Sequence, residues 1–350
     1  MSALNTLAAE ILETSAAGYA ASAVSLLQPP SGESPAGRDI GTWKSHLTQR
    51  VLELAAAVRV GEPALFARRI AWLRRAAVAR GADELALRRA LLSLQAALQR
   101  EVPGNLRPII EPALELAVKA FDDVLAPESN GLDAAKTHDR TALRYLAACL
   151  EGKTQQAIEL VLVELERGLA PADVYAHVLL AAEKEIGQLW HVGDVSIAEE
   201  RVVSETTRDL MALIVAKYAP PQPGQGTLIA AAVETNAHDI GLRAVADLFR
   251  LAGWRCLFLG ANVPAAEIAR AAEIFAVDLV VLNATLATQL KALGQAIATI
   301  HSIAPGRPIL VGGLAFEGMP QLWKQLRADA YAPTVTSAVS VGAELVYRDR

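Results

Sequence analysis

From residue 227 onward, short apolar runs with β-strand character alternate with segments whose apolar residues recur every three or four positions. Alternating strands and helices indicate an α/β fold with a parallel sheet covered on both faces. Residues 226–350 are therefore predicted to form a five-stranded, doubly wound domain of the Rossmann-like or flavodoxin-like type. We expect strands at Thr227–Val233, Arg255–Gly260, Leu279–Asn283, Pro308–Val311 and near Tyr331, and helices near residues 239–252, 264–275, 286–302, 317–326 and 335–347.

The loop after the first predicted strand carries His238, followed three residues later by Gly241. Loops that follow parallel strands meet at the carboxyl edge of the sheet, where open α/β sheets bind ligands. Asn283 and Thr285 follow the third strand, and Gly312-Gly313 follows the fourth. Glycines at this edge allow a bulky ligand to approach the backbone closely. The pattern predicts a ligand site around His238.

Several common kinds of site are excluded by the spacing around this loop. The chain lacks G-x-G-x-x-G and G-x-x-x-x-G-K-[ST], which argues against a dinucleotide site or a P-loop. It also lacks G-x-S-x-G, the nucleophile motif of hydrolases. No second His or Cys lies near His238 in sequence, so a tetrahedral zinc site is poorly supported. A single imidazole at one axial position of a metal macrocycle remains a natural use.

The chain before residue 226 is helical in pattern and contains two hinges. Residues 1–41 are predicted to be a weak, Ala-rich helix and a flexible Pro/Gly/Ser linker. Residues 42–126 are expected to form a helical bundle for interaction or dimerisation, with breaks at Gly61-Glu62-Pro63, Gly81 and Pro103-Gly104. Residues 137–219 are expected to form four helices, near 138–150, 153–168, 171–190 and 195–218.

Composition places the chain among globular proteins of a reducing compartment. It has 350 residues, is 53% hydrophobic and contains only Cys149 and Cys256, so it can bury large cores but has no disulfide framework. Charges interrupt every long apolar run, and the N-terminus lacks the pattern of a signal peptide. We therefore expect a cytoplasmic protein with no membrane segment.

Positive charge is concentrated in residues 41–110, which hold twelve Lys or Arg and five Asp or Glu, although the whole chain has a net charge of −5. Arginine pairs at 68–69, 74–75 and 88–89 supply most of it. This charge is either a solvated helix face or a patch for nucleic acid or an acidic partner. Direct DNA binding is not expected, because no helix-turn-helix or zinc-finger pattern accompanies it.

The run Asn236-x-His238-Asp239-Ile240-Gly241, with Asn283 and Gly312-Gly313 further on, resembles the cobalamin-binding Rossmann domain. That family's pattern is Asp-x-His-x-x-Gly, then a Ser-containing loop, then Gly-Gly. The resemblance implies that His238 is the lower axial ligand of cobalt. It also implies that Gly241, Gly312 and Gly313 line the slot for the nucleotide tail. It extends over about residues 138–350, because the four preceding helices resemble the family's helical cap.

Within this family, the cap motif resembles that of the light-sensing, CarH-like branch. That branch carries Trp, nine residues, and then Glu-His. Here Trp190 is followed by nine residues and then Glu200-Arg201. The resemblance implies contacts of Trp190 and Glu200 with the upper ligand, adenosylcobalamin as the cofactor, and His191 as a candidate upper ligand of cobalt. From the residues alone, Trp190 could instead be a core aromatic and His191 a surface residue at a helix end.

Three positions depart from the family pattern. Asn236 stands in place of the Asp or Glu that usually orients the His, Asn283 in place of Ser, and Arg201 in place of His. An amide oxygen at Asn236 could accept the imidazole Nδ1–H but would lend it less basicity than a carboxylate. These departures are also compatible with a cleft that binds biliverdin. Arg201 or Arg243 could then form ion pairs with the propionates of biliverdin.

Two further residues have structural and functional interpretations. Asp239 could cap the helix that follows it rather than contact the cofactor. Cys256 lies within a predicted strand, where a packed thiol is the expected role and a thioether to a bilin is the alternative.

Together these features predict a tetrapyrrole-binding light sensor rather than an enzyme. Its output would run through a protein partner, such as a transcriptional regulator, bound by the N-terminal helices of a homo-oligomer. The enzyme-class alternative is a corrinoid protein that carries methyl groups for methyltransferases. A third alternative is a scaffold whose cleft is vestigial.

Overall fold

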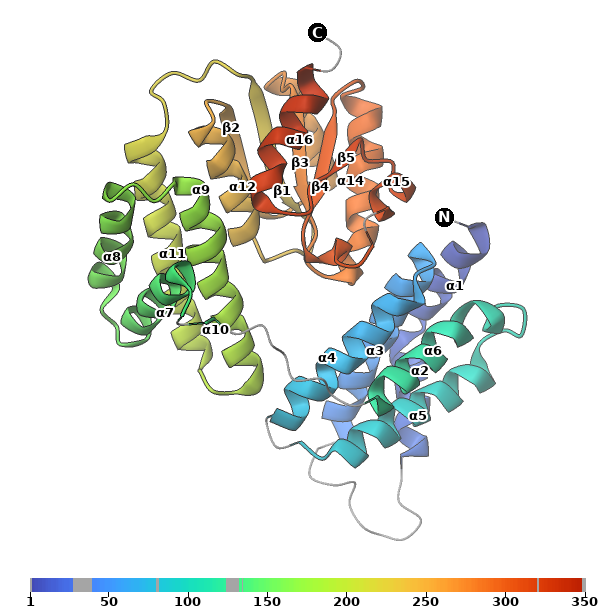
Figure 1. Ribbon diagram of the computed structural model, residues 1–350. Coiled ribbons are helices and arrows are strands. Elements are labelled where there is room, and N and C mark those ends of the chain that lie inside the picture. Colours follow the sequence, from blue (N-terminus) through green and yellow to red (C-terminus); the bar gives the residue numbers. More distant parts are fainter. Residues whose placement is uncertain are drawn as a thin grey trace. The chain divides into compact units, whose positions relative to one another are not determined.

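The computed structural model describes residues 2–27, 40–79, 82–123, 132–133, 135–319 and 321–347. The chain divides into two compact units, Met1–Pro127 and Glu128–Arg350. Each unit is described by itself (Figure 1).

The N-terminal unit is helical throughout its described part. Its helices are α1 (Ala3–Thr14), α2 (Ala16–Leu26), α3 (Ile40–Val60), α4 (Pro63–Ala79), α5 (Glu84–Glu101) and α6 (Arg107–Asp122). Local sequence explains their ends. The Asp83 side chain accepts the amides of Leu85 and Ala86 and so caps α5, whereas Pro63 opens α4, where its missing N–H costs no hydrogen bond.

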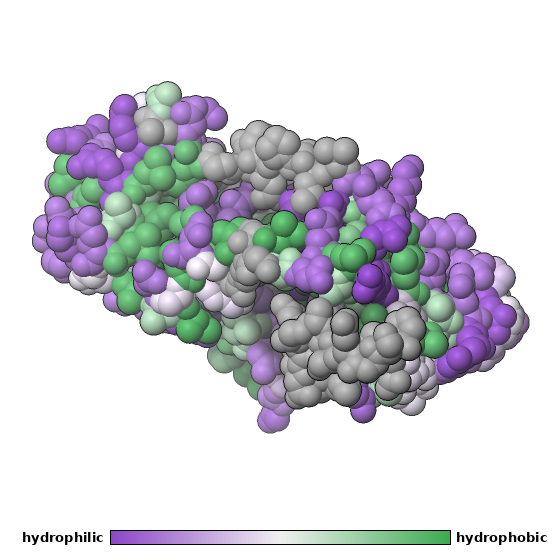
Figure 2. Space-filling model, turned by 90° about the horizontal axis from the view of Figure 1, so that it is seen from below, coloured by the Kyte–Doolittle hydropathy of each residue, from purple (hydrophilic) through white to green (hydrophobic). Residues whose placement is uncertain are grey.

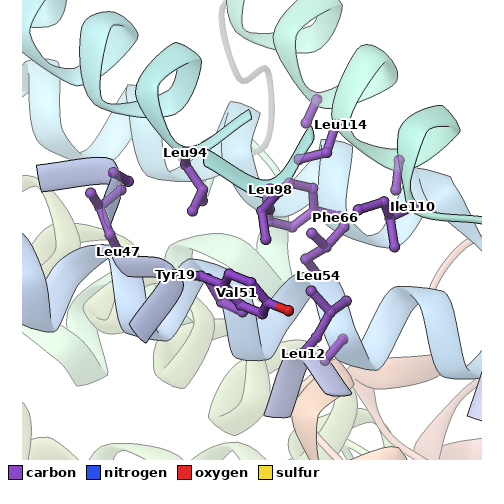
Figure 3. Close-up of a cluster of buried hydrophobic side chains, with 14 of the residues drawn as sticks. Leu12, Tyr19, Leu47, Val51, Leu54, Phe66, Leu94, Leu98, Ile110 and Leu114 are labelled. Carbon is purple, nitrogen blue, oxygen red and sulfur yellow. The ribbon is translucent and has the colours of Figure 1, made fainter. Parts of the chain in front are cut away.

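The first two helices belong to the core of this unit, which differs from the expected weak helix outside a bundle of residues 42–126. Leu12 of α1 and Tyr19 of α2 are buried in one cluster with Leu54, Phe66 and Leu98 (Figure 3). Alanines on the buried sides of α1 and α2 allow α3 to approach closely, so an Ala-rich helix that is weak alone is stabilised by packing. Most of the predicted linker, residues 28–41, lies outside the described residues.

The excess of arginine in this unit is largely used in ion pairs. Arg50 donates Nε and Nη2 to the two carboxylate oxygens of Glu53, at 2.6 and 2.8 Å. Arg69 also reaches Glu53, at 2.8 Å. Arg74 pairs with Glu84 and Arg88 with Asp122. At least one arginine of each sequence doublet (68–69, 74–75 and 88–89) therefore forms an ion pair with a carboxylate. This favours the structural interpretation of the positive charge.

The C-terminal unit begins with the predicted helical cap. Its helices are α7 (Thr137–Leu150), α8 (Thr154–Glu166), α9 (Pro171–Asp173), α10 (Leu180–Val192) and α11 (Ile197–Tyr218). A π-helical segment, Val174–Leu179, joins α9 to α10, so the expected single helix over 171–190 contains a widened turn. Gly193 ends α10 with φ of 87°, and a reciprocal pair of bonds between Ser196 and Glu199 begins α11.

The second half of this unit confirms the predicted five-stranded parallel sheet. Its strands are β1 (Thr227–Val233), β2 (Arg255–Val263), β3 (Leu279–Asn283), β4 (Ile309–Gly312) and β5 (Ala330–Tyr331), in the order β2-β1-β3-β4-β5. Every pairing is parallel. The order reverses between β1 and β3, so the crevice at their carboxyl ends is the expected ligand position.

Helices cover both faces of this sheet (Figure 1). They are α12 (Ile240–Leu251), α13 (Ala265–Ile274), α14 (Leu290–Ile303), α15 (Leu322–Gln325) and α16 (Val335–Tyr347). Helix α12 contacts α16, and α13 contacts α14, as in a doubly wound sheet. Ala244 and Leu248 of α12 are buried in the same cluster as the apolar residues of the cap, so α12 joins cap and sheet.

Figure 2 shows hydrophobic and hydrophilic residues interspersed on one face of the protein. Among the described residues, no helix combines the length and the apolar character that crossing a bilayer requires. Leu314 and Ile197, at 68% and 60% exposure, are among the most exposed large hydrophobic residues. The first follows Gly313 at the carboxyl edge of the sheet, and the second begins α11 of the cap.

Candidate functional site

The loop between β1 and α12 places His238 in an exposed position at the carboxyl edge of the sheet. Polar contacts with Asn262 of β2 hold this loop in place. The amide of Thr235 donates to Oδ1 of Asn262 at 2.7 Å, and the amide of Asn262 donates to the carbonyl of Asn236 at 2.9 Å. Thr235 and Asn262 both have positive φ, 67° and 54°. The sharp turns on β1 and β2 therefore support each other and leave the His238 ring facing solvent.

Asn236 lies under this loop and is completely buried. Its Nδ2 donates to Oδ1 of Asn283 at 2.7 Å and to the Asn283 carbonyl at 3.2 Å. Its Oδ1 accepts the backbone N–H of His238 at 3.1 Å. Within the described residues, Asn236 thus hydrogen-bonds the backbone of His238, not its ring as expected. The two departures from the family pattern, Asn236 and Asn283, pair with each other and join the loops of β1 and β3.

The two glycines after β4 differ in what constrains them. Gly313 has φ of 108°, and a Cβ there would lie 2.2 Å from the carbonyl oxygen of Ala284. A Cβ on Gly312 would lie 3.4 Å from the carbonyl oxygen of Ala332, an ordinary contact. Close packing between the loops of β3 and β4 therefore requires glycine at position 313.

Gly241, in the first turn of α12, is open. A Cβ there would meet no atom within 4 Å. Ile240, its neighbour, is half-buried and packs against the cap core. The absence of a side chain at position 241 has no packing explanation within this structure, and it leaves space beside the exposed imidazole.

Gln289 is a site residue that the sequence analysis missed. It is buried, and its Oε1 accepts the amides of Thr285 and Leu286 at 2.8 and 2.9 Å. Its Nε2 donates to the carbonyl of Thr235 at 3.3 Å. Gln289 therefore fixes the loop after β3 to the loop of His238. A lone glutamine at the start of an amphipathic helix carries no sequence signal for this role.

The cap contributes a second group of residues. The rings of Trp190 and His191, at the end of α10, are 4.8 Å apart and both half-buried. Glu200 lies in the first turn of α11, next to the largely exposed Arg201, whose Nε is 3.7 Å from its carboxylate. The two residues expected to contact the upper ligand, Trp190 and Glu200, thus lie on consecutive helices joined by the short turn at Gly193.

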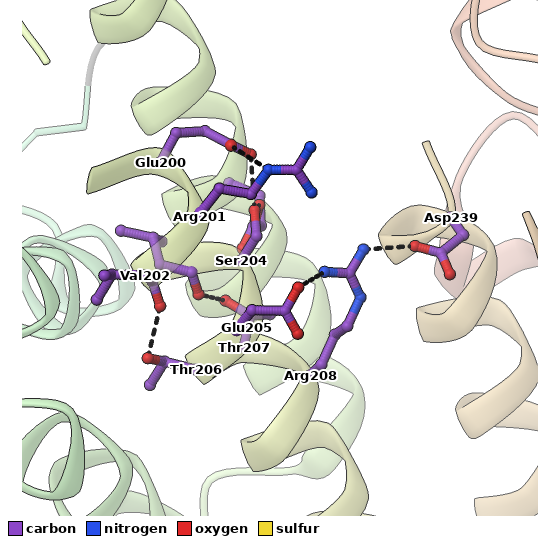
Figure 4. Close-up of polar contacts among 11 residues, drawn as sticks. Glu200, Arg201, Val202, Ser204, Glu205, Thr206, Thr207, Arg208 and Asp239 are labelled. Carbon is purple, nitrogen blue, oxygen red and sulfur yellow. Dashed lines mark hydrogen bonds and ion pairs between the residues drawn. The ribbon is translucent and has the colours of Figure 1, made fainter. Parts of the chain in front are cut away.

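Helix α11 also contacts the His238 loop directly. Arg208 donates Nη2 to Oδ1 of Asp239 at 2.7 Å (Figure 4). Asp239 occupies the N-cap position of α12, but its side chain makes no cap hydrogen bond. Asp239 thus lies at the predicted N-cap position, but its carboxylate pairs with Arg208 of the helical cap and not with the amides of α12. Arg208 belongs to no recognised sequence motif, so it was not among the predicted site residues.

A second polar contact joins cap and sheet deeper in the unit. The Tyr175 hydroxyl donates to Asp247 of α12 at 3.1 Å, and Arg250 donates to the same carboxylate at 2.6 Å. Burial raises the pKa of Asp247, and Arg250 partly offsets this.

The other candidates for a bilin site are engaged elsewhere. The guanidinium of Arg243 lies 4.5 Å from the ring centroid of Phe258, and its Nε is buried without a hydrogen-bond partner. Burial raises the pKa of the Cys256 thiol to about 12, so this cysteine is a neutral, packed group. In the described part of the chain, no three His, Cys, Asp or Glu side chains gather as a metal site of protein ligands alone.

Comparison with known proteins identifies both halves of this unit. Residues 226–340 match the model of the B12 binding domain, and residues 142–214 match a second model described by the same name. The HTH-type transcriptional repressor CarH of Myxococcus xanthus is 26% identical over 182 residues, which cover 52% of this chain and 60% of the repressor. Dimethylamine corrinoid protein 3 of Methanosarcina acetivorans is 23% identical over 203 residues, 57% of this chain and 92% of that protein.

Among solved structures, the monomethylamine corrinoid protein of Methanosarcina barkeri shares the fold with a TM-score of 0.52. It is 18% identical and covers 60% of this chain and 100% of its own. Neither the family models nor these relatives give support to biliverdin as the ligand.

The residues present fit a corrinoid. An exposed imidazole stands beside the open Gly241, and the exposed, apolar Leu314 lies at the same edge of the sheet. A flat macrocycle whose metal has one vacant axial position matches the exposed imidazole, and the apolar Leu314 could pack against its hydrocarbon parts. Residues 142–214 and 226–340 of this chain therefore form a B12 binding domain.

Proposed function

We propose that this protein is a cobalamin-dependent light sensor that signals through a protein partner. The observation that carries the proposal is the cap motif: Trp190 and His191 lie at the end of α10, Glu200 lies in the first turn of α11, and the spacing of Trp190 and Glu200 is that of the light-sensing branch of the family. The similarity to CarH supports the same choice, although it spans only 60% of that repressor.

In this proposal, His238 would hold the lower face of the cofactor and Trp190 would cover the upper ligand. Asn283, Thr285, Gly312 and Gly313 would border the tail of the cofactor. When bound, adenosylcobalamin would supply a light-sensitive cobalt–carbon bond. His191 would be available to the upper face after that bond is lost, and the ion pair of Arg208 with Asp239 would pass a shift of the cap to the His238 loop.

The N-terminal bundle would provide the output. It is a separate compact unit, Met1–Pro127, and lies before the residues that match the B12 binding models. A protein partner, such as a transcriptional regulator, would bind this bundle, and the protein would act as a homo-oligomer without catalysing a reaction.

Ultraviolet–visible spectra of the purified protein with adenosylcobalamin, recorded in darkness and after illumination, test the proposal. We expect a bound corrinoid whose spectrum changes on illumination, and a changed spectrum in the dark for His238→Ala. His301→Ala is the matched control, because His301 is also exposed but lies at the end of α14. A bound corrinoid with no response to light would contradict the sensor.

The second candidate is a carrier of methyl groups for methyltransferases. It is favoured by the match to a dimethylamine corrinoid protein, of which 92% is covered. The two candidates differ at Trp190. A sensor requires Trp190→Ala to weaken adenosylcobalamin binding or the light response, whereas a methyl carrier tolerates the change. Trp72→Ala is the control, because this half-buried tryptophan lies in the N-terminal unit.

A further inference from the structure

One face of α11 carries a row of polar side chains that the proposed function does not fully use. Glu200, Ser204 and Arg208 follow each other at four-residue spacing and therefore share one face of the helix. Figure 4 shows the row running from Glu200 through Ser204 to Arg208, whose guanidinium reaches Asp239. The row thus extends from the cap motif to the residue after His238.

A second carboxyl group joins this row from α10. The Ser204 hydroxyl oxygen lies 3.0 Å from Oε2 of Glu183 and 2.9 Å from Oε1 of Glu200. A serine hydroxyl has one proton to donate, and an ionised carboxylate can only accept. Two ionised carboxylates cannot both be satisfied by Ser204, whereas a protonated carboxyl could donate to Ser204 while Ser204 donates to the other.

Geometry places this proton on Glu183. Its second oxygen, Oε1, is buried without a hydrogen-bond partner, which is costly for a charged group. The Glu200 carboxylate is 29% exposed and lies beside the Arg201 guanidinium, which favours its charge.

The groups that face Glu183 come from two helices. Glu200, Ser204, Thr207 and Arg208 face it from α11, and the Tyr145 hydroxyl and the Cys149 thiol, whose pKa values burial raises, face it from α7. Burial is the largest effect and raises the pKa of Glu183. Ser204, Thr207 and Arg208 lower this pKa and Glu200 raises it further.

We propose that Glu183 is a neutral carboxylic acid in the folded protein and a positioning residue that, through Ser204, holds Glu200 in the cap motif. The hydrogen bonds run from the Glu183 carboxyl to the Ser204 hydroxyl and from that hydroxyl to the Glu200 carboxylate. This proposal deepens the proposed function, because the role of Glu200 at the upper face of the cofactor rests on that function. The proton on Glu183 and the hydrogen bonds through Ser204 are expected in the cofactor-free protein as well.

Infrared spectroscopy of the cofactor-free protein tests the proton. At about pH 6, well above the range in which an ordinary glutamate is protonated, we expect a carbonyl band of a neutral carboxyl group. The band should lose intensity in Glu183→Gln and keep its intensity in Glu185→Gln, a control two residues away on α10; any band that remains in Glu183→Gln is assigned to Asp247, whose pKa burial also raises. A wild-type spectrum without the band, or a band of equal intensity in wild type and Glu183→Gln, overturns the proposal.

A double-mutant cycle on the same cofactor-free protein tests positioning. We expect the loss in Tm of Glu183→Ala with Glu200→Ala to be smaller than the two single losses together, because each change breaks the same chain of bonds. Glu183→Ala with Glu166→Ala should be additive, since Glu166 pairs with Lys217 and shares no partner with Glu183. Additivity in the first pair refutes the positioning role. Neither measurement uses cobalamin, so failure to bind cobalamin would refute the proposed function alone.

Discussion

Two glutamates, Glu53 of the N-terminal unit and Glu183 of the C-terminal unit, meet the cost of burial in opposite ways. In the N-terminal bundle, Glu53 is buried between two arginines, Arg50 and Arg69, and Arg59 pairs with Glu13. In the cap, the nearest hydrogen-bond partner of the Glu183 carboxyl is a hydroxyl, and one of its oxygens has no partner. The bundle neutralises a buried charge with an opposite charge, whereas the cap lowers the cost by holding a proton.

This difference indicates which of the two units is expected to hold a functional site. Both oxygens of Glu53 are paired with arginines, which leaves this carboxylate no free acceptor for a ligand and indicates a structural role. The C-terminal unit keeps groups that its own packing does not use: the exposed His238, the open space at Gly241 and the lone oxygen of Glu183. Groups of this kind are expected at functional sites.

The largest effect should come from breaking the charge pairing of the bundle. Glu53→Ala removes the carboxylate that pairs with the buried Arg50, and removing one partner of a buried pair costs about 3–5 kcal/mol. Urea unfolding followed by circular dichroism measures the loss. Glu84→Ala is the control: its side chain is 45% exposed, so we expect about 1 kcal/mol or less. Equal losses would show that the bundle does not depend on its buried pair.

The next effect contrasts two glycines of the C-terminal unit. Gly313→Ala forces a Cβ against the Ala284 carbonyl at positive φ, and we expect a loss of about 1–3 kcal/mol in the cofactor-free protein. Gly241→Ala meets no atom and lies in a helix, so it should leave stability unchanged or raise it by about 1 kcal/mol at most.

Cobalamin titration of the same two variants sharpens this contrast. Because position 241 borders the proposed cofactor, Gly241→Ala should weaken cobalamin binding even though the protein is as stable as wild type. Unchanged affinity in Gly241→Ala would remove this glycine from the proposed site.

A smaller effect is expected at the contact between cap and sheet. Arg208→Ala breaks the pair with Asp239, and because the arginine side chain is 25% exposed we expect a loss of about 1 kcal/mol. The loss is measured by thermal unfolding of the cofactor-free protein. Lys217→Ala, which breaks an exposed pair with Glu166 on the other side of α11, should leave Tm unchanged. A greater loss for Lys217→Ala would show that Arg208 has no special role in joining the cap to the His238 loop.

The smallest effect should be the dependence of stability on pH at Glu183, because Ser204, Thr207 and Arg208 offset part of the cost of burial. The folded-state pKa of Glu183 is raised above its unfolded value, so the folded protein binds this proton more tightly. Its contribution is complete below the unfolded pKa and is lost as the pH rises through the folded pKa.

Measuring Tm against pH for wild type and Glu183→Gln isolates this contribution. The wild-type Tm should fall relative to that of the variant as the pH rises above the usual carboxyl range. Parallel curves would mean that burial does not perturb Glu183, and the contrast between the two units would then be lost.

Much of the fold could be predicted from the sequence because its signals are local. The periods of apolar residues placed all five strands and the helices of the cap, and the chain divides after Pro127, at the hinge of residues 126–131. The predicted linker of residues 28–41 does not divide two units, because α1 and α2 share the core of the bundle. The alternation of strand and helix predicted a parallel sheet but not the order of its strands, which depends on which strands pair in the folded domain. The N-terminal helices were underestimated, since alanine contributes little to a periodic pattern and its value depends on the helix packed against it.

The site could be predicted only in part. The motif around His238 and the pair of glycines identified a corrinoid-binding edge, which the family comparison confirms, whereas the role of each residue remains a prediction. The hydrogen bonds of Asn236 could not be predicted, because its partner Asn283 lies 47 residues away in the chain. Gln289 and Arg208 were missed for the same reason.

The sequence by itself thus determined the order of the elements, the alternating α/β architecture and the class of cofactor, all of which depend on neighbouring residues or on a short motif. Tertiary structure alone decided that Asp239 binds Arg208 instead of capping its helix, and that Ser204 lies between two carboxyl groups. These outcomes depend on which groups, distant in the sequence, are buried next to each other, and on the loss of solvent around them. The spacing of residues along the chain predicts neither of these.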